Sequence, residues 1–215
     1  MEPEEFVNKI KKAYDDAAKS AYPVEGRIIR GTQKSISALS EDLFAKYVSE
    51  LIPDRYEIWI DPQISVIGKR NKTGKKNLLI RPDVCVYDKA KKEIKLIFDL
   101  KMDLGYHRSG FTDFAFDRYD ELNDAKTSIG KWRDKEFQFS KDLIWNFIVI
   151  NEGNININVL KQIKNDIENK GRIGFFTLVS GDHLNRAERK NEKNKSEINK
   201  ADFDEIEKLI KTKCK

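Results

Sequence analysis

Residues 94–102 constrain the fold more than any other stretch, because an apolar residue stands at every second position. This alternation predicts a β-strand that buries one face against a core. The side chains between the apolar ones point to the opposite face, so Asp99 and Lys101 should emerge together from it. An acid and an amine are thus expected side by side on a largely buried strand.

An apolar run at residues 78–87 precedes this strand, and only the polar segment 88–92 separates the two. A connection this short predicts a β-hairpin, and antiparallel pairing would bring Asp83 near Asp99. Pro82 cannot donate a hydrogen bond to a neighbouring strand, so we expect a bulge or a strand start beside it. The hairpin would therefore join two carboxylates and one amine.

These groups are the equipment of a metal-dependent phosphodiesterase. Carboxylates with room for water suit Mg²⁺, which takes one or two protein carboxylates together with a substrate phosphate. Such an ion polarises a phosphoryl oxygen and activates a bound water. Lys101 would orient or deprotonate that water, or stabilise the charge of the transition state. A structural interpretation also exists, because Pro-Asp is a common turn dipeptide and acid-x-Lys triplets recur by chance in a chain with 36% charged residues. The position of Asp99 and Lys101 at the end of an apolar strand favours the catalytic interpretation.

Pro82-Asp83 followed by Asp99-Leu100-Lys101 resembles the motif of the PD-(D/E)xK nuclease superfamily. The resemblance covers the motif and the order of elements over residues 36–180. It implies an α/β fold of the α+β type, with a mixed sheet and a restriction-endonuclease-like αβββαβ core flanked by helices. It also implies that Asp83, Asp99 and the backbone carbonyl of Leu100 hold Mg²⁺, for which Mn²⁺ would substitute, and that Lys101 serves the attacking water.

Many members of that family carry a glutamate near the metal on the first core helix. Residues 35–51 predict such a helix from an apolar stripe at helical spacing. The stripe consists of Leu39, Leu43, Phe44, Tyr47, Val48 and Leu51. Glu41 borders the stripe whereas Asp42 points away from it, which makes Glu41 the candidate catalytic residue and metal ligand. Glu41 could equally be a first-turn acid favoured by the helix dipole, with Ser37 or Ser40 as the cap.

Three segments carry candidate DNA-binding side chains. Residues 68–77 contain five cations and no acid, and as a loop near Asp83 they would bind phosphates by displacing counterions. Such a composition is also typical of a solubilising hairpin tip. Residues 26–34 precede the Glu41 helix, and residues 102–110 follow the active-site strand, where they could meet DNA or form an ordinary surface loop. The candidates are Lys69, Arg70, Lys72, Lys75, Lys76, Tyr106, His107, Arg108, Arg30 and Lys34. His183 belongs to no acid-rich pattern and receives no role.

The rest of the chain predicts a scaffold of helices and strands. We expect helices at 6–19, within 113–134, at 157–170 and at 201–213, buried strands at 143–150 and 173–179, and a charged loop at 185–200. Together these elements form a single nuclease domain over residues 1–215, with its core at residues 36–180.

The composition predicts a cytoplasmic protein with one core. The chain has 215 residues, 39% of them hydrophobic and 10% aromatic, which is ample for a single domain. Two cysteines argue against a disulfide framework and for a reducing compartment. No stretch resembles a membrane span, and the acidic N-terminus lacks the regions of a signal peptide. Since no glycine-rich nucleotide loop is visible, we expect no nucleotide cofactor.

These patterns together predict a Mg²⁺-dependent endonuclease that hydrolyses phosphodiester bonds of double-stranded DNA. By analogy within the family, a small domain without an ATPase suits a type II restriction endonuclease that works as a homodimer on a palindromic site. A structure-selective nuclease, of the junction resolvase or repair type, would have the same site. A non-catalytic DNA-binding module with a nuclease-like fold is the remaining alternative. The net charge of +5 is a modest excess, so binding to nucleic acid would depend on where the cations cluster rather than on their number.

Overall fold

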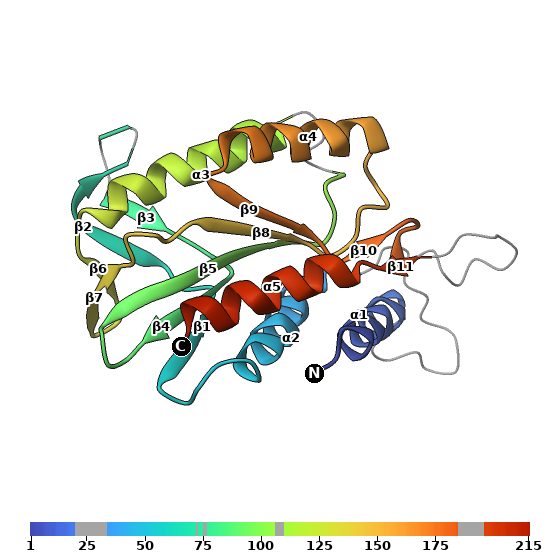
Figure 1. The fold of residues 1–215 in the computed structure, drawn as a ribbon, viewed down its shortest axis with the longest axis horizontal. Helices are drawn as coiled ribbons and strands as arrows, with labels where there is room; N and C mark the ends of the chain where they lie inside the picture. The colour runs from blue at the N-terminus through green and yellow to red at the C-terminus, as the bar shows by residue number, and fades with distance from the viewer. Residues whose placement is uncertain (20–33, 72, 75–76, 106–109, 185–195) are drawn as a thin grey trace, which may run out of the picture.

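The computed structural model describes residues 1–19, 34–71, 73–74, 77–105, 110–184 and 196–215, and it is built around a mixed β-sheet (Figure 1). Strand β5 (Glu93–Lys101) lies at the centre of this sheet. On one edge it pairs antiparallel with β4 (Val84–Asp88), and β4 pairs antiparallel with β1 (Tyr56–Ile60). On the other edge it runs parallel to β8 (Trp145–Val149), which is parallel to β9 (Ile173–Thr177).

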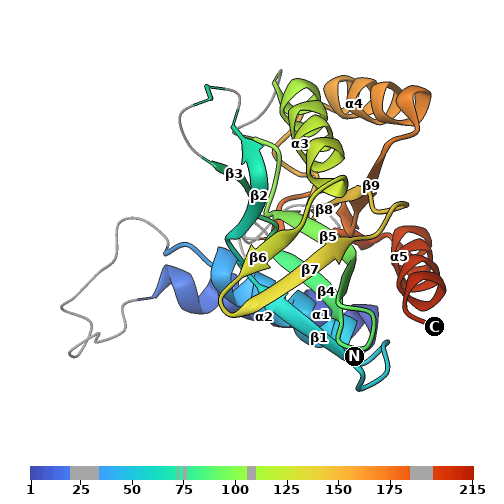
Figure 2. The same ribbon diagram turned by 90° about the vertical axis from the view of Figure 1, so that its left-hand side faces the viewer.

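A second arm of the sheet leaves the first residues of β5. There β5 pairs in parallel with β7 (Lys135–Phe139). The arm continues antiparallel through β6 (Gly130–Trp132) and β2 (Ile64–Arg70) to β3 (Asn77–Ile80). Figure 2 shows β2 and β3 bending away from the plane of β4 and β1. The short strands β10 (Val179–Ser180) and β11 (Glu197–Ile198) form a separate pair.

Five helices within the described residues flank the sheet on both faces (Figure 1). Helices α1 (Pro3–Ala18), α2 (Ser37–Ser49) and α5 (Lys200–Lys213) cover one face, and α3 (Phe111–Lys126) and α4 (Ile157–Lys170) cover the other. Each face has its own hydrophobic cluster. The fold is therefore the predicted mixed α/β arrangement, and α2, β1, β4, β5, α3 and β8 follow the order αβββαβ with the β2–β3 and β6–β7 pairs inserted. In the part of the chain that the structure describes, no helix has the length and apolarity needed to cross a membrane.

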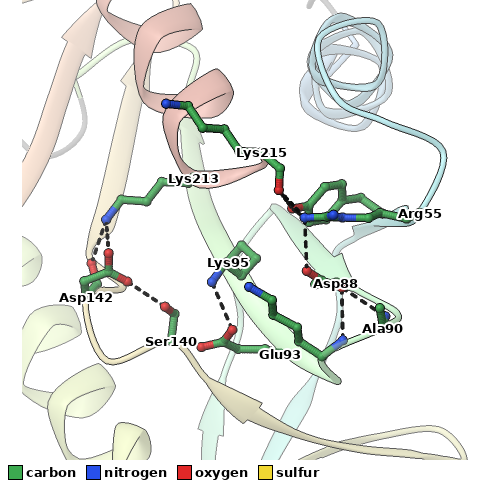
Figure 3. Close-up of polar contacts among 11 residues, drawn as sticks. Arg55, Asp88, Ala90, Glu93, Lys95, Ser140, Asp142, Lys213 and Lys215 are labelled. Carbon is green, nitrogen blue, oxygen red and sulfur yellow. Dashed lines mark hydrogen bonds and ion pairs between the residues drawn. The ribbon is translucent and has the colours of Figure 1, made fainter.

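The C-terminal end of α5 is fastened to the rim of the sheet (Figure 3). The Lys213 ammonium contacts the Asp142 carboxylate in the connection between β7 and β8. The Arg55 guanidinium contacts the backbone carbonyl of Lys215 and lies 3.8 Å from the buried Asp88 carboxylate. These polar contacts hold the C-terminal end of α5 against the sheet near the start of β5, at the opposite end of that strand from Lys101.

The alternation predicted for the central strand holds over the second half of β5 and fails at its start. Leu96 and Leu100 enter the cluster on the α2 side, and Ile97 enters the cluster on the α3 side. Ile94 was expected beside Leu96 but packs on the α3 side. The reason is a bulge. On β4 the neighbouring residues Val86 and Tyr87 pair with Leu96 and Ile94, so Lys95 between them has no partner residue on β4. One extra residue moves every preceding side chain to the other face.

The run at residues 78–87 is two strands rather than one. Strand β3 ends at Ile80 and β4 begins at Val84, so Pro82 and Asp83 lie in the break between them. The expected strand start after Pro82 is confirmed. Because β3 belongs to the second arm of the sheet, Asp83 lies where the chain passes from one arm to the other.

The start of α2 differs from the prediction. Neither Ser37 nor Ser40 caps it, since the N-cap is Ile36 and the Ser40 hydroxyl instead donates to the Ile36 carbonyl at 2.9 Å. Leu39 does not belong to the buried stripe, because 47% of its surface is exposed. The predicted helix boundaries elsewhere are close, and α4 ends at Gly171, whose φ of 57° is the left-handed conformation that favours glycine. The predicted charged loop at 185–200 contains β11, and its residues 185–195 lie outside the described residues.

Candidate active site

The first turns of α2, the start of β4 and the end of β5 meet at a cavity of about 710 Å³. Glu41, Asp83, Leu100 and Lys101 all line it. Asp99 joins them because its carboxylate contacts the Lys101 ammonium. We call Glu41, Asp83, Asp99 and Lys101 the carboxylate–lysine site. The expected proximity of the two strand aspartates and the shared face of Asp99 and Lys101 are both confirmed.

Backbone geometry explains why Asp83 reaches the end of β5. The β4–β5 register pairs Val84 with Phe98, so the residue before β4 lies beside the residues after Phe98. The Asp83 carboxylate Oδ2 accepts the backbone N–H of Leu100 at 2.5 Å. Its own carbonyl accepts the backbone N–H of Asp61 at 2.8 Å, which ties it to the end of β1. Asp83 is therefore held from two sides, and its position does not depend on a ligand.

The site has an excess of buried negative charge. Burial, and after it the repulsion of the nearby Asp99 carboxylate, raise the pKa of Asp83 to about 7 against the opposing effect of Lys101. Burial also raises the pKa of Glu41, followed by the repulsion of Asp61 and Asp42. Carboxylates that share a poorly solvated site disfavour one another's ionisation, and a bound cation reverses this effect. The electrostatics of the site thus favour a cation.

The donor set fits a hard divalent cation. Carboxylates of Asp83, Asp99 and Glu41 and the carbonyl of Leu100 offer oxygen atoms, the ligands that Mg²⁺ and Mn²⁺ accept. Among the described residues, no three histidine, cysteine or acidic side chains form a group that could hold a metal by themselves. Mg²⁺ usually completes its coordination with water and substrate phosphate. These residues would therefore supply part of a metal site that water and a phosphate group complete.

The candidate DNA-binding residues fall into three groups. Lys34 lines the cavity together with the carboxylate–lysine site. Lys69 and Arg70 end β2, at the far end of the β2–β3 hairpin from Asp83, and the Arg70 guanidinium donates to Asn77 at 3.2 Å. Neither lines the cavity. The remaining candidates, which lie outside the described residues, are Arg30, Lys72, Lys75, Lys76, Tyr106, His107 and Arg108.

A second group of polar side chains lines the same cavity and was not predicted. It consists of Tyr14, Asp103, Asn154 and His183, and we call it the Asp103 cluster. Residues 102–110 were predicted either to meet DNA or to form an ordinary surface loop, and Asp103 itself was not singled out. The one sequence signal for it is parity, because Asp103 continues the series of Asp99 and Lys101. Tyr14, Asn154 and His183 come from distant segments, and no local pattern relates them.

No protein-family model matches this chain, and a comparison with curated proteins finds no match either. The functional argument therefore rests on the residues and the geometry of the cavity.

Proposed function

We propose that this protein is a Mg²⁺-dependent DNA endonuclease. The observation that carries the proposal is that Glu41 of α2, Asp83 just before β4 and Lys101 of β5 line a single cavity, with the buried Asp99 carboxylate in contact with that lysine. The raised pKa of the Asp83 carboxyl group supports it, since a site with surplus carboxylates suits a metal ion and a phosphate group. Within this proposal, the resemblance to PD-(D/E)xK nucleases assigns the reaction as hydrolysis of a phosphodiester.

Each residue would have a distinct role in that reaction. Asp83, Asp99, Glu41 and the Leu100 carbonyl would hold the metal ion, which when bound supplies Lewis-acid polarisation of a phosphoryl oxygen and activation of water. Asp99 also holds the Lys101 ammonium at the site through their direct contact. From there Lys101 would orient the attacking water or stabilise the negative charge that develops on the phosphoryl oxygens.

Within this class we favour a type II restriction endonuclease that acts as a homodimer on double-stranded DNA in the cytoplasm. This finer proposal is carried by the family resemblance and by symmetry, since a palindromic site matches a two-fold dimer. A structure-selective nuclease of the resolvase or repair type and a non-cutting DNA-binding module make different predictions in the same experiment.

The decisive experiment is cleavage of supercoiled plasmid by the purified protein with Mg²⁺ or with EDTA. We expect cutting with Mg²⁺ and none with EDTA. Asp83→Asn, Asp99→Asn and Lys101→Ala should each lower the cleavage rate by at least about 10²-fold, the usual loss when one transition-state contact is removed. DNA binding in Ca²⁺, measured by gel shift, should survive in all three variants.

The chain offers a matched control on the same strand. Lys95 pairs with Glu93 at 2.9 Å, also two residues apart on β5 (Figure 3). This pair lies at the start of the strand, whereas Lys101 and the cavity lie at its end. Lys95→Ala should cut DNA like the unsubstituted protein. If Lys95→Ala and Lys101→Ala lose activity equally, the effect is structural and the assignment of Lys101 is wrong.

The cleavage products separate the subclasses. Discrete bands indicate sequence-specific cutting, a smear indicates non-specific cutting, and preference for branched DNA indicates a structure-selective nuclease. DNA that stays intact over many sequences and branched substrates would contradict the nuclease proposal. Binding without cutting, unchanged by Lys101→Ala, would instead support a DNA-binding module.

A further inference from the structure

The Asp103 cluster shares a cavity with the carboxylate–lysine site but takes no part in the chemistry proposed for it. Its four side chains come from α1, from the chain after β5, from the chain after β8 and from the chain after β10. Four separate segments thus place polar groups on one wall. The hydrogen bonds that orient these four side chains indicate what the wall can bind.

Asp103 is the centre of the cluster. Its Oδ1 accepts the backbone N–H of Gly105 at 2.7 Å, and its Oδ2 accepts the Asn154 amide at 3.1 Å and lies 3.1 Å from His183 Nε2. The hydrogen bond with His183 is the main cause that lowers the pKa of the Asp103 carboxyl group. The carboxylate therefore stays ionised, and protein donors occupy its lone pairs. Because its oxygens already accept these hydrogen bonds, Asp103 serves to orient Asn154 and His183 rather than to bind a ligand itself.

The consequence is that two side chains are oriented. His183 is only 3% exposed, its Nε2 faces Asp103, and the Tyr14 ring meets it edge-on with centroids 5.4 Å apart. A carboxylate on one ring nitrogen fixes the orientation of an imidazole. Asn154 is exposed, one of its two amide hydrogens is directed to Asp103, and no acceptor among the described residues takes the other, which can meet a ligand. Burial raises the pKa of the Tyr14 hydroxyl, which therefore keeps its proton.

The backbone beneath the cluster is locked as well. The buried Asn151 amide donates to the Asp182 carbonyl at 3.1 Å, and its oxygen accepts the Gly153 N–H at 2.8 Å. Gly153 lies so close to the next loop that a Cβ there would be 2.3 Å from the His183 backbone nitrogen. The loops that carry Asn154 and His183 are thus fastened together, and the wall is formed before any ligand arrives.

We propose that the Asp103 cluster binds the DNA backbone at the phosphate that adjoins the scissile phosphate. This inference rests on the proposed nuclease function. Amide and ammonium groups are donors that proteins direct at phosphate and sugar oxygens to fix the register of DNA. Lys34, which is exposed and lines the same cavity, adds a cation. Asn154 and Lys34 contact the substrate, and Asp103, held in turn by the buried His183, is the positioning residue that orients Asn154.

The test is a cycle that combines protein variants with modified DNA. The substrate is a DNA duplex whose cleavage position has been mapped. In two modified duplexes, a methylphosphonate replaces the phosphate on one side or the other of the scissile phosphate, which removes the charge of that single phosphate. The kcat and KM of Asn154→Ala are measured on the modified and unmodified duplexes. Asn154 is exposed, so this variant should fold, and Asn123→Ala, an exposed asparagine on α3 outside the cavity, is the matched control.

We expect Asn154→Ala to raise KM by at least about tenfold with little change in kcat, the effect of one lost hydrogen bond to a charged group. The methylphosphonate at the contacted phosphate should slow the unsubstituted protein and should not slow Asn154→Ala further. Groups in contact give such non-additive effects, whereas a structural role gives additive ones. His183→Gln, which can keep a donor toward Asp103, should lie between the unsubstituted protein and His183→Leu in KM.

The failures are distinguishable. If the unsubstituted protein cuts no DNA, the proposed function falls and this assignment falls with it. If it cuts DNA but both neighbouring methylphosphonates act additively with Asn154→Ala, only the phosphate assignment is overturned. The same holds if Asn154→Ala and Asn123→Ala have equal KM values.

Discussion

Asp83 is an acid placed where its ionised form is unfavourable. Its carboxylate is largely buried beside Asp99, and only the Leu100 N–H and the Lys101 ammonium offset the cost. Natural proteins accept such a cost at functional positions, where activity and stability conflict. We therefore expect a substitution that removes the charge of Asp83 to stabilise the fold and to abolish cleavage.

The pH dependence of this cost has a definite sign. Because the pKa of Asp83 is raised from 3.8 to about 7, the folded protein holds this proton more tightly than the unfolded chain does. The loss of stability is absent below about pH 4, grows as the pH rises to about 7 and is complete above it. Asp83→Asn removes the charge and keeps an oxygen for the Leu100 N–H. We expect it to raise the free energy of unfolding in EDTA by up to about 4 kcal/mol at about pH 8, with little effect at about pH 4.

Urea unfolding of both proteins at the two pH values measures this difference. Asp120→Asn, an exposed acid on α3, is the control and should change stability little at either pH. Addition of Ca²⁺ should stabilise the unsubstituted protein and leave Asp83→Asn nearly unaffected, since ligand binding to the folded state alone stabilises it. Equal stability of Asp83→Asn and the unsubstituted protein at about pH 8 would show that Asp83 is not destabilised by its surroundings.

At the scale of elements, sequence patterns predicted helix bounds and strand faces correctly where only a helical or a strand periodicity decides them. The helix at 157–170 matches α4 in both bounds, because an apolar stripe and a glycine with positive φ define it. The parity of Asp99 and Lys101 was right because the bulge at Lys95 comes before them. Ile94, on the other side of the bulge, was placed wrongly. A bulge depends on how two strands pair, and alternation within one strand contains no sign of it.

No pattern in the sequence indicates how closely strands β8 and β9 approach each other. This close approach predicts that a larger residue at Gly174 destabilises the fold. Gly174 faces the buried Asn146 in register, and a Cβ at Gly174 would lie 2.2 Å from Asn146 Oδ1. Asn146 cannot easily move, because its amide donates to the Ile97 carbonyl of β5 at 3.0 Å. Gly174→Ala should therefore lower the free energy of unfolding by about 2 kcal/mol through overpacking.

The urea midpoint measures the effect of Gly174→Ala, with an unchanged denaturant slope as the sign that the fold is kept. Gly171→Asn is the comparison, since asparagine tolerates the left-handed conformation at the end of α4 and should cost less than about 1 kcal/mol. Equal midpoint shifts for the two variants would contradict a packing role specific to Gly174.

At the scale of the whole molecule, the cavity is made by segments that are distant in sequence. The carboxylate–lysine site could be predicted because its strand residues lie within one hairpin, and Glu41 because helix phase placed it on the inner border of α2. The Asp103 cluster could not, since Tyr14 and His183 meet only after α1 packs beside the chain that follows β10. Contacts of that kind depend on the packing of complete elements, and no local periodicity reports them.

The proposed homodimer gives a prediction for the whole molecule. If two subunits each cut one strand of a palindromic site, a dimer with one inactive subunit should only nick DNA. Mixing the unsubstituted protein with a large excess of Asp99→Asn should therefore shift the plasmid product from linear to open-circular. Sedimentation of the protein on a short duplex should give twice the chain mass of 25.0 kDa in addition to the DNA. An unchanged ratio of linear to nicked product would mean that each subunit cuts independently, which is the behaviour of a monomeric nuclease.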